Sequence, residues 1–220
     1  MESALDFSVG FRARKDRAIR AHTYILDGAM SAFRFATLVS LFLNPAVLAV
    51  LALIATSGEV PNPTFRWMAI ALGPGLPVLF AVYLRASGRV SAIFIPRSRD
   101  RIIPLLVASL SCFLAGTLLF RAGASSVPVS LLFGFSLMSA ALAAVAAFWH
   151  PSLHVAGGAA SATAVAFVFP RASGLFWAAV CLVAWSRLKT RSHTIAQVVA
   201  GGLIGSTVFL LTHLLMTRML

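Results

Sequence analysis

Apolar residues fill most of this chain in long runs separated by short polar segments. A helix needs about 20 predominantly apolar residues to cross the hydrocarbon core of a bilayer. In lipid every backbone polar group must be hydrogen-bonded internally, which favours helices. The pattern predicts an all-α, polytopic integral membrane helical bundle with six or seven transmembrane helices. The runs are Phe35–Thr56, Trp67–Leu84, Ile102–Phe120, Val127–Trp149, Val155–Pro170, Gly174–Ser186 and Thr194–Met216.

Two details of these runs predict how the helices bend and pack. Asn44-Pro45 interrupts the first run, so we expect a kink there. Small residues at Gly157-Gly158 and between Gly201 and Gly205 are typical of close helix–helix contacts. The fifth and sixth runs are short, and for this reason the predicted number of spans is six or seven.

The composition agrees with a membrane protein. Of the 220 residues 60% are hydrophobic and 11% are charged, whereas a soluble domain carries about 25% charged residues. The formal net charge is +12, with the basic residues concentrated at the boundaries of the apolar runs. Without a basic patch interleaved with aromatic residues, we expect no nucleic-acid partner. The expected partners are a bilayer with anionic lipids and a phosphate-bearing substrate.

The chain divides into two parts by charge. Residues 1–30 contain five basic residues mixed with apolar ones, and we interpret them as a basic amphipathic N-terminal segment at the membrane surface. A disordered basic tail is the alternative. Residues 31–220 form the predicted membrane-embedded domain.

Three polar clusters are predicted to share one face of the membrane. Two apolar runs separate residues 97–101 from 150–154, and two more separate 150–154 from 187–193. With this topology 14 of the 18 Lys and Arg residues lie on the cluster face. The positive-inside rule then makes that face cytoplasmic, and we expect the cell membrane as the location.

The residue types in these clusters favour phosphate chemistry. Transfer of a phosphoryl group needs a nucleophile, a proton donor for the leaving group and positive groups on the equatorial oxygens. His154 and His193 supply two imidazoles, which titrate near neutral pH. Arg187 and Arg101 supply planar guanidinium groups, which bind phosphate oxygens in pairs. Ser152 can donate a further hydrogen bond.

The motifs resemble those of the type 2 phosphatidic acid phosphatases, a superfamily shared with vanadium haloperoxidases. Ser186-Arg187, five residues, His193, three residues and Gln197 resemble the third signature, which ends in Asp. Pro151-Ser152-Leu153-His154 resembles the second signature, Pro-Ser-Gly-His. The segment from Arg97 to Arg101, followed by Pro104, resembles a weakened first signature. The resemblance covers about residues 95–205.

The resemblance implies a role for each matching residue. His193 is the nucleophile that becomes a phosphohistidine, and His154 is the acid and later the base. Gln197 stands where the family has the Asp that orients the nucleophile. Phosphate binding falls to Arg187, Arg101, Arg97, Ser152, Leu153 and His150, of which His150 lies beside the motif and Arg97 stands in for the family's lysine. The family works without a metal, so we expect no cofactor.

These observations predict an integral membrane lipid phosphatase. The candidate substrates are phosphatidate, phosphatidylglycerol phosphate, and polyprenyl phosphates or diphosphates. The alternative is a non-catalytic lipid-phosphate binding protein, or a transporter that retains the pocket. The neutral Gln197 favours this alternative more than an Asp would.

Overall fold

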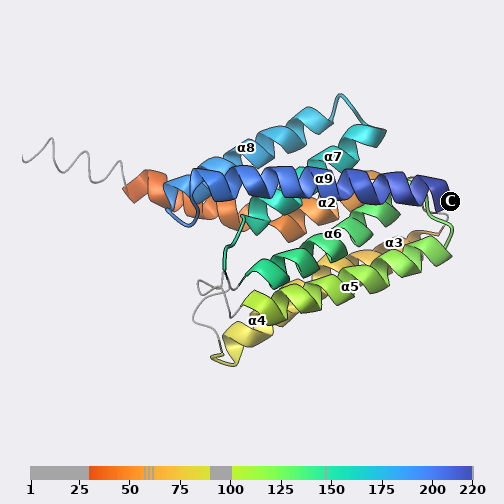
Figure 1. Ribbon diagram of the computed structural model, residues 1–220, viewed down its shortest axis with the longest axis horizontal. Coiled ribbons are helices and arrows are strands. Elements are labelled where there is room, and N and C mark those ends of the chain that lie inside the picture. Colours follow the sequence, from red (N-terminus) through yellow and green to blue (C-terminus); the bar gives the residue numbers. More distant parts are fainter. Residues whose placement is uncertain are drawn as a thin grey trace, which may run out of the picture.

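The described part of the chain is helical throughout and contains no strand, which confirms the predicted all-α class. The computed structural model describes residues 30–56, 58, 60, 62–89, 101–146 and 148–219. The elements, most of them labelled in Figure 1, are the helix Met30–Phe42, α2 (Pro45–Thr56), α3 (Pro63–Ile70), a π-helical segment (Ala71–Gly75), α4 (Leu76–Ala86), α5 (Ile102–Arg121), α6 (Ser126–Val145), α7 (Leu153–Val168), α8 (Ser173–Lys189) and α9 (Ile195–Met219).

Four of the described helical rods are long and apolar enough to cross a membrane, or five if the bent pair at the N-terminal side is one span. The four are Pro63–Ala86, Ile102–Arg121, Ser126–Val145 and Ile195–Met219. α7 and α8 have 16 and 17 residues. At 1.5 Å per residue, α7 is about 24 Å long, below the hydrocarbon thickness of about 30 Å. The predicted six or seven spans are therefore not confirmed by helix length and composition.

The predicted kink at Asn44-Pro45 is confirmed. The helix Met30–Phe42 and α2 meet at an angle of 46°. The side-chain oxygen of Asn44 accepts hydrogen bonds from the N–H groups of Ala46 and Val47, each at 3.0 Å. Pro45 occupies the first position of α2, where a helix needs no N–H donor. Asn44 thus ends one helix and caps the next.

A second irregularity lies in the rod made of α3, the π-helical segment and α4. Pro74 is inside the π-helical segment and has no N–H to donate. A local π-helical adjustment is one way in which membrane helices accommodate a proline. Gly73 in the same segment faces α5 and α6, where an added Cβ would lie 2.8 Å from the Leu132 side chain and 3.3 Å from that of Ala115.

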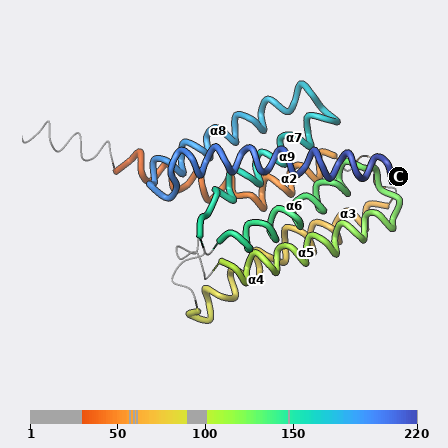
Figure 2. The backbone as a smooth tube through the Cα atoms, viewed as in Figure 1, coloured from red at the N-terminus to blue at the C-terminus, as the bar shows by residue number. Residues whose placement is uncertain are grey.

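Helix α7 is the central helix of the half of the bundle that carries the motifs. It packs against α2, α6, α8 and α9, and Figure 2 shows the backbones of α7, α8 and α9 gathered in this half. Small residues fill α7, and nearly all of it from His154 to Val165 is buried. Gly157 gives room to α2, because an added Cβ would lie 2.6 Å from Pro45 Cβ.

The closest helix contact joins α7 to α9. A Cβ on Gly201 would lie 2.6 Å from the carbonyl oxygen of Ser152, and one on Gly205 would lie 2.0 Å from that of Ala156. Only glycine allows two helix backbones to approach this closely. The predicted close contact at these glycines is therefore present, and its partner is the first turn of α7.

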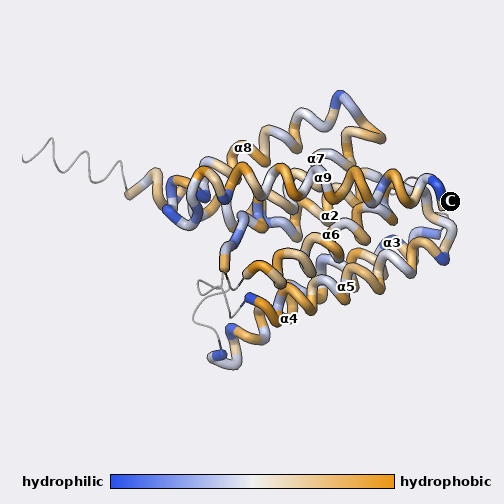
Figure 3. The backbone as a smooth tube through the Cα atoms, in the orientation of Figure 1, coloured by the Kyte–Doolittle hydropathy of each residue, from blue (hydrophilic) through white to orange (hydrophobic). Residues whose placement is uncertain are grey.

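The outer surface of the bundle is apolar. Large side chains are exposed on several helices, including Leu79 at 68%, Leu110 at 61% and Leu203 at 65%. In Figure 3 the hydrophilic colour is strongest at the ends of helices and in loops, while hydrophobic colour dominates the helix bodies. Exposed apolar surface on this scale indicates contact with lipid, as expected of an integral membrane protein.

Two predicted features lie outside the described residues. One is the predicted surface segment, of which residues 1–29 are not described. The other is the part of the first motif that precedes Arg101, including Arg97.

The α7–α9 contact predicts a difference between two neighbouring glycines. Gly205→Ala should lower the free energy of unfolding by at least about 2 kcal/mol, because its methyl group would overlap the Ala156 backbone. Gly202→Ala is the matched control, since its Cβ would meet Val155 Cγ1 at an ordinary 3.7 Å. It should be neutral, or stabilising by up to about 1 kcal/mol. Thermal unfolding in detergent measures both, and equal midpoints for the two variants would contradict the contact.

Candidate active site

After α8 the chain turns back, and this makes Arg187 and His193 neighbours. The carbonyl oxygen of Arg187 accepts hydrogen bonds from the N–H groups of Ser192 at 3.0 Å and His193 at 3.3 Å. Arg191 has a φ of 53°, the left-handed conformation that often follows a helix C-terminus. Its N–H bonds to the carbonyl of Leu188 at 3.0 Å, which completes a Schellman motif.

The first turn of α9 is closed by a capping box that includes Gln197. The Gln197 side-chain oxygen accepts the N–H of Thr194 at 3.0 Å, and the Thr194 hydroxyl accepts the N–H of Gln197 at 3.4 Å. This reciprocal arrangement is the one that Thr-x-x-Gln sequences form at helix N-termini. Gln197 also contacts His193, with 3.3 Å between its Oε1 and the imidazole Nδ1.

This geometry determines which nitrogen of His193 carries the proton. A backbone N–H can only donate, so the Gln197 atom that faces Thr194 is the oxygen. An oxygen accepts, and Nδ1 of His193 must therefore be the donor in that pair. The neutral imidazole then keeps its lone pair on Nε2. Nε2 is the nitrogen that a nucleophilic histidine would use.

The start of α7 is bonded directly to α9. The N–H of Ser152 donates to the carbonyl of Gln197 at 2.9 Å, and Ser152 lies under Gly201. Ser152 is fully buried, and its hydroxyl oxygen has no hydrogen-bond partner. The backbone bond between Ser152 and Gln197 brings the second motif against the third.

Arg187 is a buried cation in a region without carboxylates. It is only 7% exposed, and its Nε has no hydrogen-bond partner. The described part of the chain contains no Asp or Glu, because all six acidic residues lie outside it: Glu2, Asp6, Asp16, Asp27, Glu59 and Asp100. Buried charges are normally paired. Arg187 and the Ser152 hydroxyl therefore fit an anion that this part of the protein does not itself supply.

His193 is held in its neutral form by its surroundings. Burial and, after it, the nearby charges of Arg187 and Arg101 together lower its pKa from 6.5 to about 4, against the Gln197 hydrogen bond, which raises it. Arg101, the residue before α5, belongs to the first motif. Its charge acts on His193, so the first motif lies near the third. A neutral imidazole retains the lone pair that attack on phosphorus requires.

His154 of the second motif and His150 beside it lie at different depths. His154, in the first turn of α7, is 9% exposed and within electrostatic reach of Arg187, His193 and Arg101. His150 lies in the segment before α7 and is half-buried. Its ring centroid is 6.0 Å from that of His193. Burial and Arg101 lower the pKa of His150.

The structure thus groups most of the predicted site residues at one end of the bundle. His193, His154, His150, Arg187, Arg101, Ser152 and Gln197 are linked by the contacts above. Leu153, which replaces the family's glycine, is the first residue of α7 and packs against the hydrophobic core. Arg97 lies outside the described residues. His213 lies apart from this group, stacked on Phe209 near Phe167.

Ser40 is a site residue that the sequence analysis missed. Its hydroxyl accepts a hydrogen bond from Arg187 Nη1 at 3.3 Å and is bonded to the Ser186 hydroxyl. Ser40 is buried at 2% exposure on the helix Met30–Phe42. A serine within an apolar run is a signal for a buried polar contact, but the sequence does not say with which residue.

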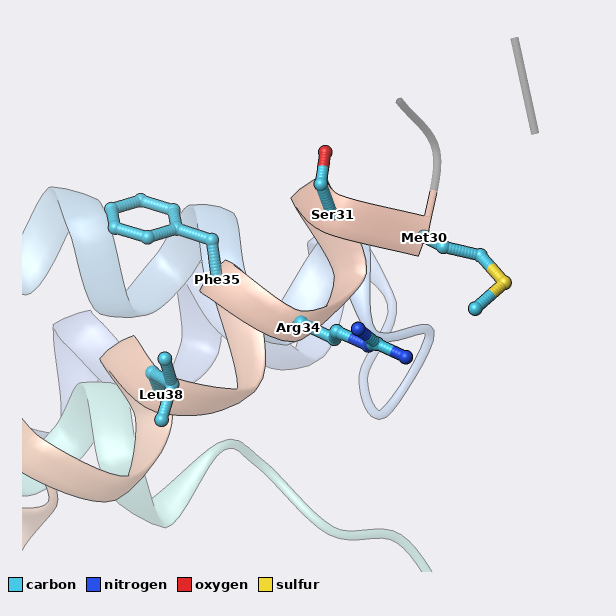
Figure 4. Close-up of a pocket in the computed structure, with 5 residues that line it drawn as sticks. All are labelled: Met30, Ser31, Arg34, Phe35 and Leu38. Carbon is cyan, nitrogen blue, oxygen red and sulfur yellow. The ribbon is translucent and has the colours of Figure 1, made fainter. Parts of the chain in front are cut away.

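A surface pocket at the N-terminal helix is separate from these residues. Figure 4 shows its five lining side chains, which all come from the helix Met30–Phe42: Met30, Ser31, Arg34, Phe35 and Leu38. None of the predicted site residues lines it. The histidine and arginine cluster is therefore a different part of the molecule from this pocket.

The lowered pKa of His193 predicts a loss of stability in acid. Between about pH 6.5 and pH 4 the unfolded chain binds a proton at this residue and the folded chain does not, so stability must fall as the pH falls. His193→Gln should reduce that fall. The measurement is the thermal unfolding midpoint from pH 7.5 to pH 4.5 in detergent. A variant that loses as much stability in acid as the unmodified protein would disprove the effect.

The Ser40 contacts predict a cost for removing its hydroxyl. Ser40→Ala leaves Ser186 and Arg187 each short of one buried partner, so the free energy of unfolding should fall by about 1–3 kcal/mol. Thr37→Ala on the same helix is the control, because Thr37 is exposed and bonds only to the Phe33 carbonyl. Its effect should stay within about 0.5 kcal/mol. Denaturant or thermal titration compares the two, and similar losses would argue against the contact.

Comparison of the chain with family models, with curated proteins and with solved structures gives no match in any of the three. The resemblance to the type 2 phosphatidic acid phosphatases therefore depends on the short motifs. The second and third motifs and Arg101 of the first lie among the described residues.

Proposed function

We propose that this protein is a membrane phosphatase that removes a phosphate or diphosphate group from a lipid through a phosphohistidine at His193, and that it is related to the type 2 phosphatidic acid phosphatases. One observation carries the proposal above the others. A neutral His193 with Nε2 unprotonated lies within electrostatic reach of Arg187, a buried cation for which the described part of the chain offers no carboxylate.

The chemistry is derived from these positions. Nε2 of His193 attacks phosphorus, and Nδ1–H remains bonded to Gln197 as positive charge develops on the ring. Arg187 and Arg101 stabilise the negative charge on the phosphoryl oxygens, as positive groups do in other phosphoryl transfers. Ser152 and backbone N–H groups at the start of α7 donate to the same oxygens. His154 of the second motif or His150 beside it donates a proton to the leaving group. We propose that no metal takes part, since the arginines supply the positive charge.

The membrane setting favours a lipid substrate. The site residues lie at one end of a bundle whose outer surface is apolar. A lipid can place its headgroup there while its chains stay in the bilayer. We propose that the short helices α7 and α8 also cross the membrane, which gives seven spans, and that the site faces the cytoplasm of the cell membrane. Phosphatidate, phosphatidylglycerol phosphate and polyprenyl phosphates or diphosphates are the candidate substrates.

A second candidate function is binding of lipid phosphates without hydrolysis, by a binding protein or a transporter. The neutral Gln197 favours it. An Asp at this position would stabilise a positively charged His193 by a full charge, whereas the amide oxygen of Gln197 offers only a dipole. The bond to Thr194 shows that Gln197 also has a structural use in the capping box.

Release of inorganic phosphate from a panel of the candidate lipids tests the proposal. The protein in detergent, with EDTA present, should release phosphate from at least one of them. His193→Ala should reduce the rate at least about 1000-fold, because it removes the nucleophile. Arg187→Lys should reduce it about 100-fold, because a lysine keeps the charge but loses the planar fork.

Lys189→Ala is the matched control for charge. Lys189 is an exposed cation in the last turn of α8, two residues from Arg187. Its loss should change the rate less than about 3-fold, since exposed charges are strongly screened. A protein that binds phosphatidate micelles, loses that binding in Arg187→Lys and yet releases no phosphate would establish the binding alternative instead.

A further inference from the structure

We propose that His150 is the catalytic residue that transfers the proton to the leaving-group oxygen and later takes one from water, a role that the motif resemblance gives to His154. This inference rests on the proposed function, because it concerns a proton transfer within that reaction. It comes from a residue outside the matching motif and from where the structure puts it.

The ring of His150 lies next to the ring of His193. The two ring centroids are 6.0 Å apart and the ring planes meet at 60°. His150 lies in the segment before α7, two residues before the buried Ser152, and is half-buried. A residue that protonates a leaving group must be within hydrogen-bond reach of the reacting phosphoryl group, usually after some tightening around the substrate. In an in-line displacement the leaving oxygen lies across phosphorus from the nucleophile. A ring centred 6.0 Å from that of His193 is near enough to reach that oxygen after such tightening.

The depth of His154 favours a different role for it. His154 is 9% exposed, lies in the first turn of α7 and is within electrostatic reach of Arg187, Arg101 and His193. An acid must carry a proton when the substrate is bound, and placing a positive charge at depth beside two guanidinium groups is costly. His154 is better suited to stay neutral and to donate one hydrogen bond to a phosphoryl oxygen.

Protonating His150 costs less free energy than protonating His154. Arg101 and His193 are charged or titratable groups that act on His150. Partial exposure lets water screen Arg101 and lets the ring exchange protons with solvent. Such exchange is needed because the acid of the first step becomes the base of the second. The attacking water also reaches the phosphohistidine from the side that is open to solvent.

The reaction then balances in two steps. In the first, the Nε2 lone pair of His193 forms the N–P bond, the P–O bond to the lipid breaks, and the oxygen takes that electron pair and the proton of His150. In the second, water attacks phosphorus and gives a proton to His150. The N–P bond breaks, its electron pair returns to Nε2, and inorganic phosphate leaves.

Two substrates that differ in the leaving group test this assignment. The full-length protein, His150→Gln and His154→Gln are compared with phosphatidate, whose alkoxide must be protonated, and with 4-nitrophenyl phosphate, whose phenolate leaves without a proton. His150→Gln should hydrolyse phosphatidate at least about 100-fold more slowly. With 4-nitrophenyl phosphate it should show a burst of nitrophenolate about equal to the amount of enzyme, followed by slow turnover, because phosphorylation needs no acid but hydrolysis still lacks its base. His154→Gln should slow both substrates by similar factors, and only His150→Gln should lose a limb of the pH–rate profile.

The outcomes separate the two proposals. A defect that depends on the leaving group in His154→Gln, with equal or no effect on both substrates in His150→Gln, overturns the assignment of His150 and leaves the proposed function intact. Release of no phosphate by the unmodified protein from any candidate lipid or from 4-nitrophenyl phosphate overturns both. Thermal unfolding confirms that each variant is folded. If His154→Gln does not fold, the comparison of the two substrates in His150→Gln still decides, because His150 lies outside the helices and is half-buried.

Discussion

The candidate site depends on the backbone contact between α7 and α9. Gly201 and Gly205 let α9 lie directly on the carbonyl groups of Ser152 and Ala156. The N–H of Ser152 then reaches the carbonyl of Gln197 at 2.9 Å. In a membrane, where apolar side chains gain little by leaving lipid, such close packing and hydrogen bonding hold helices together. With a methyl group at either glycine the two backbones would have to separate, and the second and third motifs with them.

The segment between α8 and α9 is held by two local hydrogen-bonded motifs. The Schellman motif after α8 and the capping box before α9 are each satisfied within a few residues. Together they place His193 beside Arg187 and fix the His193 tautomer through Gln197. One glutamine thus starts a helix and orients an imidazole. This double use gives a physical reason for Gln at a position where the resembling family has Asp, since the longer amide reaches both Thr194 and the ring.

The candidate site carries positive charge that no described carboxylate neutralises. Arg187 and Arg101 act on the same histidine while the described part of the chain contains no carboxylate. Positive groups that are partly removed from water and not neutralised by acids bind an anion strongly. Burial, together with the same field, keeps His193 neutral. A bound phosphate would offset this field, so binding of the substrate and protonation of the surrounding imidazoles are coupled.

The sequence by itself determined the all-α class, the kink at Asn44-Pro45 and the close contact at the glycines, because these depend on hydropathy and on the geometry of proline and glycine. It left the number of spans open, since α7 and α8 are shorter than the bilayer. Only the tertiary structure decided the relative depth of His150 and His154, the place of Ser40 under Arg187 and the approach of Arg101 to His193. These depend on which helices pack together, and long-range packing leaves no periodic mark in a chain whose helices are apolar on nearly every side.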